Sequence, residues 1–321
     1  MNHTVTIGKT GLSTFKLGFG AGVVGNSMMY PKVDDNLSRQ LIQTVLDQGI
    51  SFIDTAFLYG LGHSEELIGE ALKKHGGREH LVISTKASPS PSFTEQGLQV
   101  DNSPAALRQA VDDSLLRLQT DYIDLFFLHF PDSRTPLGEA AETLAELKKS
   151  GKIRAIGASN LSFEQLLEFN ANKYLDVLQA EYSLLVRQPE KDIIPYLLQH
   201  DISLIPFFPL ASGLLAGKYK KEDVFTDTSR LNNPLFQKEA YLANLERVEQ
   251  FKAFAQAKGA EPAQLALAWL LTRPVVDLII PGATRPDQIE SNLLTLNVHL
   301  NEDELQQLDS IFKTNLVSTN R

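Results

Sequence analysis

Residues 50–69 read ISFIDTAFLYGLGHSEELIG and contain the unit that repeats along the whole chain. A short apolar run, Phe52 and Ile53, ends in a carboxylate, Asp54, and a tyrosine, Tyr59, follows on the adjoining loop. After the tyrosine, the spacing of apolar residues over 64–76 is typical of an amphipathic helix. An apolar strand, a polar loop and a helix together form one βα unit of an α/β protein.

The same alternation continues through the rest of the sequence. Helical patterns such as 37–49, 103–118, 137–151 and 162–172 separate short β-rich runs, and several begin at Ser and end at Gly or Asn, as capping predicts. The predicted strands are residues 16–20, 51–54, 81–86, 123–129, 153–160, 176–181, 203–208 and 277–282. Strict βα alternation implies parallel strands joined by right-handed crossovers. Eight units in 321 residues predict a closed (β/α)8 barrel, with a doubly wound open sheet as the alternative.

Two features complete the predicted architecture. Residues 4–16, TVTIGKTGLSTFK, are typical of a β-hairpin that turns at residues 9–11. No Pro-, Gly- or Ser-rich linker is long enough to separate two domains, so we expect one barrel domain over residues 1–321.

Composition excludes several classes of function. A net charge of -9 argues against a nucleic-acid or anionic-membrane surface, since both need clustered Lys and Arg. No window approaches the ~20 apolar residues of a membrane span, and the start lacks the apolar core of a signal peptide, so we expect a cytoplasmic protein. The chain has no cysteine, which excludes disulfides, thiolate nucleophiles and cysteine-bound metals. We therefore expect a small-molecule partner, and the oligomeric state stays open.

Residues at the ends of the predicted strands carry the candidate chemistry. In a parallel barrel these ends meet on one face, which would gather Asp54, Lys86 and His129, with Tyr59 on the loop after Asp54. A phenol has a pKa of about 10, and a nearby ammonium lowers that pKa by favouring the phenolate. A carboxylate keeps the lysine charged, and an imidazole can orient a carbonyl. This set suits carbonyl reduction, in which a general acid protonates the developing alkoxide.

Several motifs in order then resemble the aldo-keto reductase superfamily over essentially the whole chain. They are FIDTAFLYGLGHSEELIG, STKA, YIDLFFLHFPD, GKIRAIGASN, LQAEYSLLVR, PFFPLASGLLAGKY and IIPGATRPDQIESN. The wording of LHFPD, FPLASGLLAGKY and IPGA is most similar to bacterial members associated with inositol operons. The resemblance implies Tyr59 as general acid and base, Lys86 and Asp54 as its tuning pair, and His129 as the residue that orients the substrate.

The resemblance also implies a nicotinamide cofactor. Ser159, Asn160 and Gln179 match positions that hydrogen-bond the carboxamide, and Phe207 stands where the family often has a stacking Tyr. The expected cofactor-binding residues are Gly20, Ser159, Asn160, Gln179, Phe207, Pro209, Leu210, Gly213, Leu214, Lys218, Arg230, Gly282, Thr284, Arg285, Gln288 and Asn292. The expected substrate pocket comprises Val24, Met29, Phe57, Phe93, Phe130 and Phe208. No histidine shows metal-ligand spacing, so we predict no metal site.

The choice between NADP(H) and NAD(H) depends on one loop. Many members carry IPKS and a downstream Arg to bind the 2'-phosphate, whereas this chain has Gly282 and Gln288 there. Arg285 remains, beside Thr284 and close to a helix start at Pro286, where backbone N–H groups can also bind phosphate. We therefore predict a modest NADP(H) preference, with NAD(H) usable.

Two other functions fit parts of the sequence. A Schiff-base aldolase would use Lys86 at a barrel strand end, but it leaves Asn160 and Gln179 unexplained. A cofactor-binding regulatory or channel-associated module would have little turnover. The intact set of Asp54, Tyr59, Lys86 and His129 favours an enzyme that reduces aldehydes or ketones, whose physiological substrate stays open.

Overall fold

The computed structural model describes residues 3–89, 91–94 and 97–312. Seven parallel strands form one curved sheet in the order β11-β10-β9-β8-β5-β4-β3, so neighbours in the sheet follow one another along the chain. The strands are β3 (Phe19–Gly20), β4 (Phe52–Asp54), β5 (Val82–Ala87), β8 (Ile123–Leu128), β9 (Ile153–Ser159), β10 (Val177–Glu181) and β11 (Ser203–Phe207). This order has no reversal point, which excludes the doubly wound alternative.

The segment before α10 closes the barrel without forming a regular strand. Instead of the expected strand over 277–282, one parallel bridge pairs Leu17 with Ile279. Backbone hydrogen bonds run from Gly18 N to Ile279 O (2.8 Å) on one side and from Leu204 N to Val275 O (2.8 Å) on the other. Pro281 has no N–H to donate, which limits a longer ladder. The predicted (β/α)8 barrel is confirmed, although its eighth strand is reduced to a bridge.

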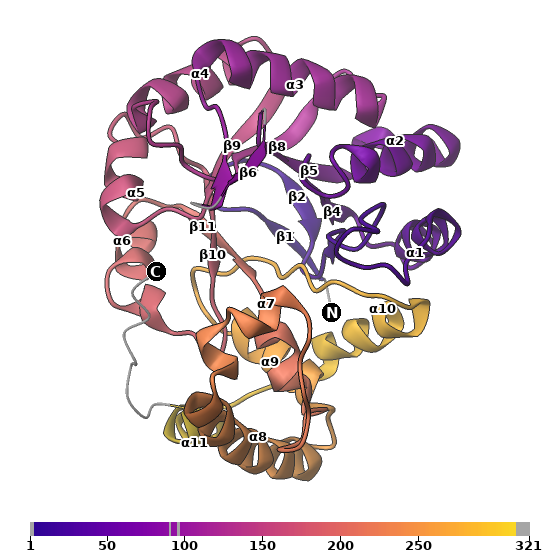
Figure 1. Ribbon diagram of the computed structural model, residues 1–321, viewed down its shortest axis with the longest axis vertical. Coiled ribbons are helices and arrows are strands. Elements are labelled where there is room, and N and C mark those ends of the chain that lie inside the picture. The colour runs from indigo at the N-terminus through magenta and orange to yellow at the C-terminus, as the bar shows by residue number, and fades with distance from the viewer. Residues whose placement is uncertain (1–2, 90, 95–96, 313–321) are drawn as a thin grey trace.

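The helices lie around the outside of the strands (Figure 1). They are α1 (Asp35–Asp47), α2 (His63–His75), α3 (Pro104–Leu118), α4 (Leu137–Lys149), α5 (Phe163–Phe169), α6 (Ile193–Gln199), α7 (Thr228–Leu231), α8 (Lys238–Lys258), α9 (Pro262–Leu271), α10 (Pro286–Leu293) and α11 (Glu302–Phe312). Short 3-10 turns occupy η1 (Arg78–His80), η2 (Gln188–Glu190), η3 (Ala211–Ala216), η4 (Pro234–Phe236) and η5 (Leu294–Asn297). The five helical patterns named from sequence all form helices. At α5, Ser162 and Gln165 form a reciprocal capping box, so the Ser start has its expected cause.

The predicted N-terminal hairpin closes one end of the barrel. β1 (Thr4–Thr6) pairs antiparallel with β2 (Ser13–Phe15), as predicted. Ile7 at the turn is fully buried and packs with Phe52, Val82 and Val177, which begin their strands. The hairpin therefore covers the amino ends of the strands and leaves their carboxyl ends free for the site.

A second hairpin, β6 (Ser92–Thr94) with β7 (Gly97–Gln99), lies in the loop after β5 and was not predicted. Its strands are three residues each and include polar residues, so they lack the apolar alternation that marks a strand.

Among the described residues, no helix is long and apolar enough to span a membrane.

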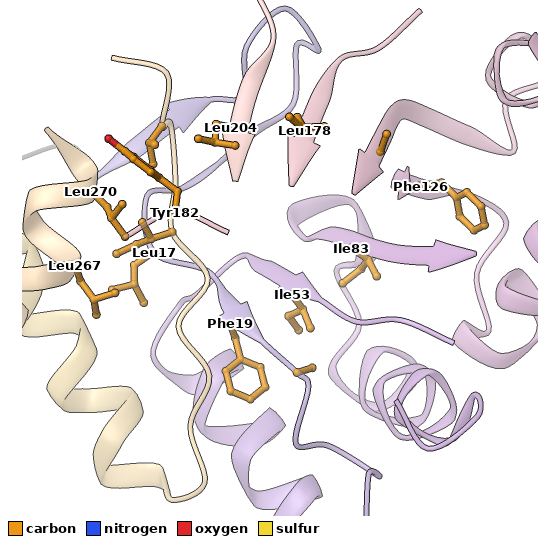
Figure 2. Packing of buried hydrophobic residues seen from close by; sticks show 14 of the residues in the cluster. Leu17, Phe19, Ile53, Ile83, Phe126, Leu178, Tyr182, Leu204, Leu267 and Leu270 are labelled. Carbon is orange, nitrogen blue, oxygen red and sulfur yellow. The ribbon is translucent and has the colours of Figure 1, made fainter. Parts of the chain in front are cut away.

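Alternation along the strands decides which side chains point into the barrel. The inner cluster contains Ile7, Phe52, Val82, Leu125, Phe127, Ala155, Val177, Ile205, Leu278 and Ile280. The intervening residues, among them Ile53, Ile83 and Phe126, join the outer cluster beneath the helices, part of which Figure 2 shows. Because successive strand residues face opposite sides, Asp54, Lys86, Gln179 and His129 share the inward parity. On each strand they follow the apolar inner-cluster residue by two or four positions, so they lie at the carboxyl ends of the strands.

Gly157 on β9 makes room for the floor of this region. A Cβ atom added at Gly157 would lie 2.2 Å from Phe127 Cδ1, so no larger residue fits without moving the ring. The Phe127 ring in turn lies 5.8 Å from Lys86 Nζ. The glycine thus sets the position of the aromatic ring below the lysine.

Candidate active site

Lys86 and Asp54 form a buried ion pair between neighbouring strands β5 and β4. Lys86 Nζ donates to Asp54 Oδ2 at 2.6 Å and to the Thr55 carbonyl oxygen at 2.8 Å. Burial lowers the pKa of Lys86, but the charge and hydrogen bond of Asp54 raise it, and the pKa ends above the ordinary value. Lys86 is therefore a fixed ammonium, as the sequence predicted for a lysine beside a carboxylate.

Asp54 has two further donors. Ser84 Oγ donates to Asp54 Oδ1 at 2.6 Å, and Gln179 Nε2 donates to the same oxygen at 3.0 Å. Gln179, which we predict to bind the carboxamide of a cofactor, also holds Asp54 through its amide N–H. Ser84 was missed, although it lies two residues before Lys86 and so faces the same side of β5. Donors from β5 and β10 fix the carboxylate toward Lys86.

Tyr59 lies on the loop between β4 and α2, above the ion pair. Lys86 Nζ lies 5.3 Å from the centre of its ring, and His129 meets that ring edge-on at 6.3 Å. Burial raises the pKa of Tyr59 and outweighs the lowering by the Lys86 ammonium, so the phenol is protonated at neutral pH. The sequence predicted only the lowering, because the depth of burial could not be known.

The loop that carries Tyr59 is held in place by close backbone contacts. Gly60, with φ of 67°, approaches Gly25 so closely that an added Cβ atom would lie 2.0 Å from the Gly25 oxygen. Ser64 N donates to Tyr59 O at 3.2 Å, and Thr55 Oγ1 donates to Ser64 Oγ at 2.8 Å. These contacts give the tyrosine one position relative to Lys86.

His129 follows β8 and is buried beside Tyr59. Burial, assisted by the Lys86 charge, holds the pKa of His129 well below its ordinary value, so the ring is neutral. Phe130 stacks on the ring at 4.5 Å, and Asn160 Nδ2 donates to the His129 carbonyl oxygen at 3.0 Å. Ser88 Oγ lies 3.1 Å from His129 Nδ1. The structure thus brings all four predicted catalytic side chains together at one end of the barrel.

The predicted pocket residues fall into different environments. Met29 and Phe208 are 64% and 51% exposed, and Phe130 lies against His129. Val24 is fully buried in the outer cluster, so it packs inside the protein and lines no open pocket. Phe57 packs under the Arg117 guanidinium at 4.9 Å and lines a cavity of about 150 Å³ beside α3. The side chain of Phe93 lies outside the described part of the chain.

Several predicted cofactor residues also have structural reasons for their identity. Gly20 admits no Cβ, which would lie 2.6 Å from the Ile280 oxygen, and it adjoins Gly282 where the barrel closes. Leu214 is buried in the outer cluster. Ser159 Oγ accepts from Asn160 Nδ2 at 2.9 Å, and Phe207 meets Phe208 edge-on at 5.4 Å. The remaining positions on this side, Pro209, Leu210, Gly213 and Asn292, lie on the segments that follow β11 and on α10.

Three cations gather near the start of α10. Burial lowers the pKa of Lys218, and the charges of Arg230 and Arg285 lower it further. Arg230 pairs with Asp227 at 2.9 Å, and Arg285 donates to both Asp287 carboxylate oxygens at 3.0 Å. Cationic side chains near a helix N-terminus suit a phosphate. The residues present therefore fit the phosphate end of a nicotinamide dinucleotide.

Gln288 has a local role in this loop. The Thr284 backbone N–H donates to Gln288 Oε1 at 2.7 Å, and Thr284 Oγ1 donates to the same oxygen at 3.1 Å. Gln288 thus holds the loop that precedes α10.

Within residues 3–89, 91–94 and 97–312, no group of three His, Asp or Glu side chains is arranged to hold a metal ion.

His63 gives the region a pH-dependent contact. At the start of α2, Nδ1 lies 3.0 Å from Glu66 and Nε2 lies 2.9 Å from Asp35 on α1, and these hydrogen bonds raise the pKa of His63. A raised folded-state pKa stabilises the protein below about pH 6.5, and this contribution is lost as the pH rises through the folded-state pKa.

We expect His63→Gln to lower Tm more at acid pH than at alkaline pH, measured by thermal unfolding from about pH 5 to 9. The effect should be small, because the His63 side chain is 38% exposed. A difference in Tm that is the same at every pH would contradict a charged His63 bridge.

Several known proteins are similar to this chain over nearly its whole length. The family model described as "Aldo/keto reductase family" matches residues 16–313. Aldo-keto reductase YhdN of Bacillus subtilis is 36% identical over 98% of this chain and 95% of its own length. The NADH-specific methylglyoxal reductase of Escherichia coli is 34% identical over 93% of this chain and 94% of its own length.

A solved structure gives the same result for the fold. The structure of a glycerol dehydrogenase from Gluconobacter oxydans superposes with a TM-score of 0.88 at 32% identity, covering 99% of this chain and 98% of that one. These names give no support to the expected likeness to inositol-operon members. The chain belongs to the aldo/keto reductase family of nicotinamide-dependent carbonyl reductases.

Proposed function

We propose that the protein reduces aldehydes or activated ketones with Tyr59 as the general acid. The observation that carries this proposal is the buried Lys86–Asp54 pair, with a 2.6 Å contact, directly beside Tyr59 and a neutral His129. Groups with perturbed pKa values that face one another at the mouth of a barrel are typical of catalysis.

Each group then has a separate task. A nicotinamide cofactor held beside Ser159, Asn160 and Phe207 would supply the hydride for the carbonyl carbon. The Tyr59 hydroxyl gives its proton to the carbonyl oxygen as negative charge develops there. Lys86 stabilises the phenolate that remains, and Asp54 keeps Lys86 charged. His129 donates a hydrogen bond that orients the carbonyl oxygen.

The aldolase alternative is disfavoured by the state of Lys86. A Schiff base needs a free amine, whereas Asp54 raises the pKa of Lys86 and both Asp54 and the Thr55 oxygen hold its protons. A regulatory module without turnover would not need a protonated Tyr59 next to that cation. An assay that follows oxidation of the reduced cofactor with a panel of aldehydes tests this choice, because no turnover with any member would favour the module.

We propose that the substrates are small and uncharged near the carbonyl. The exposed side chains predicted at the mouth, Met29 and Phe208, are apolar, and a relative is named a methylglyoxal reductase. Methylglyoxal and short neutral aldehydes are therefore the first compounds to assay. A marked preference for phosphorylated or carboxylated substrates would contradict this substrate class.

We propose a modest preference for NADP(H) over NAD(H). Lys218, Arg230 and Arg285 support it, because burial lowers the pKa of Lys218 and the charges of both arginines lower it further. The Asp287 carboxylate opposes this preference, since it accepts two hydrogen bonds from the Arg285 guanidinium and so competes with a phosphate for them. One relative is named as NADH-specific, so the quantity to measure is the ratio of kcat/KM for NADPH over that for NADH.

We expect Arg285→Ala to reduce the ratio of kcat/KM for NADPH over that for NADH by about tenfold. Charge-assisted hydrogen bonds are worth ~1.5 to 3 kcal/mol, and competition from Asp287 favours the lower end. Arg108→Ala is the matched control, because Arg108 is also exposed and paired with a carboxylate but lies on α3. An unchanged ratio in Arg285→Ala would show that this side chain does not read the 2'-phosphate.

Three sequence predictions remain proposals. They are a single domain over residues 1–321, a cytoplasmic location, and the closer likeness to inositol-operon members. We base the first on the βα rhythm, which runs through the chain without a linker.

A further inference from the structure

Ser88 makes one contact that the proposed chemistry has not used. It lies directly after β5, two residues beyond Lys86, and is fully buried. Its Oγ lies 3.1 Å from His129 Nδ1, across the pairing of β5 with β8. Phe130 stacks on the same ring, and Asn160 holds the His129 backbone. The imidazole is thus fixed in position, with one ring nitrogen directed at a hydroxyl.

The protonation state of the ring makes that contact decisive. A neutral imidazole carries one proton, on either Nδ1 or Nε2, and the other nitrogen accepts. If Nδ1 carried the proton, the buried Ser88 O–H would need another acceptor. Among the described residues, His129 Nδ1 is the hydrogen-bond partner of the Ser88 hydroxyl, so the O–H donates to Nδ1. That direction leaves the proton on Nε2.

We propose that Ser88 is a positioning residue that keeps His129 in the Nε2–H tautomer, so that the ring donates a hydrogen bond to the substrate carbonyl oxygen. The proposal rests on the proposed function, because it gives His129 its donor. Burial keeps the ring neutral by lowering the pKa of His129, and Lys86 contributes, since a cation nearby disfavours a second positive charge. Ser88 acts through His129 and touches no reacting atom.

Loss of the hydroxyl should then weaken orientation of the carbonyl without affecting the cofactor. A net hydrogen bond is worth ~0.5 to 1.5 kcal/mol, so Ser88→Ala should lower kcat/KM for the carbonyl by roughly two- to tenfold. The Kd of the cofactor should not change. Ser88→Thr keeps the hydroxyl, and the adjoining cavity of about 150 Å³, which Ser88 lines, has room for the added methyl group. The threonine variant should therefore recover most of the wild-type value.

Ser114→Ala is the matched control. Ser114 is also buried and lines the same cavity, but its hydroxyl accepts from Arg117 Nη2 at 3.3 Å instead of contacting His129. Its kcat/KM should stay at the wild-type value. A fall equal to that of Ser88→Ala would assign the effect to packing around the cavity and overturn the proposal.

The deciding experiment reads the tautomer directly by NMR of protein labelled with ¹⁵N in the histidine rings, with the His129 signals assigned from a His129→Asn sample. In wild type, Nδ1 should show the shift of an unprotonated nitrogen and Nε2 that of an N–H. Ser88→Ala should move both shifts toward a tautomer mixture, and Ser88→Thr should restore them. A proton on Nδ1 in wild type, or unchanged shifts in Ser88→Ala, would overturn the proposal. The NMR measurement needs no turnover, so it tests the role of Ser88 independently of the proposed function. If only the proposed function were wrong, the wild-type protein would be inactive but would still show the Nε2–H tautomer.

Discussion

Replacing Tyr59 by phenylalanine is expected to lower kcat for carbonyl reduction by ~10²- to 10⁴-fold, the usual contribution of general acid catalysis. The change removes only the hydroxyl, which the buried environment keeps protonated. Lys86 and Asp54 keep their ion pair and His129 keeps its contact with Ser88, so the fold and the cofactor Kd should be nearly unchanged. Steady-state kinetics with a neutral aldehyde, together with cofactor titration, measures both quantities.

Tyr196→Phe is the control for this substitution. Tyr196 lies on helix α6 outside the strands. Its hydroxyl accepts from Asn170 Nδ2 at 3.0 Å and not from any residue of the proposed chemistry. It should retain the wild-type kcat. A Tyr59→Phe enzyme that kept half of its kcat would rule out Tyr59 as the proton donor.

Lys86→Met is expected to cause a loss of kcat of similar size, because no cation then stabilises the phenolate. It should also destabilise the protein, since Asp54 would remain as a buried carboxylate without its counter-ion. Removing one partner of a buried ion pair typically costs about 3–5 kcal/mol. Thermal unfolding and kcat should therefore both fall.

The double variant Lys86→Met with Asp54→Asn separates the two effects. It removes both charges, so most of the lost Tm should return while kcat stays low. If kcat recovered together with Tm, the activity of the single variant would have been lost through unfolding, and the proposed role of the ammonium would be wrong.

The repeating βα pattern was sufficient to predict the barrel and the gathering of Asp54, Tyr59, Lys86 and His129. Strand ends of a parallel barrel meet whatever their distance in sequence, and strand parity fixes which residues face inward. The same parity could have found Ser84, which precedes Lys86 by two residues. Ser88 has that parity too, but only the structure shows its contact with His129.

Properties that depend on depth and on partner choice could not be read from the sequence. The pKa of Tyr59 rises because burial outweighs the nearby ammonium, and two opposing effects can be ranked only once the position is known. Gln179 donates to Asp54, and Arg285 donates to Asp287, and neither partner can be identified from the sequence alone. The eighth strand shrinks to a bridge since Pro281 cannot extend the ladder.

Transfer of deuterium from a reduced cofactor deuterated at the nicotinamide C4 position tests carbonyl reduction through Tyr59 most directly. Mass spectrometry of the alcohol formed from methylglyoxal or a short aldehyde would report the label on the former carbonyl carbon. We expect wild type to produce labelled alcohol at a rate that Tyr59→Phe lowers by ~10²-fold or more. No labelled alcohol from wild type across the aldehyde panel, or equal rates from wild type and Tyr59→Phe, would contradict carbonyl reduction with Tyr59 as the proton donor.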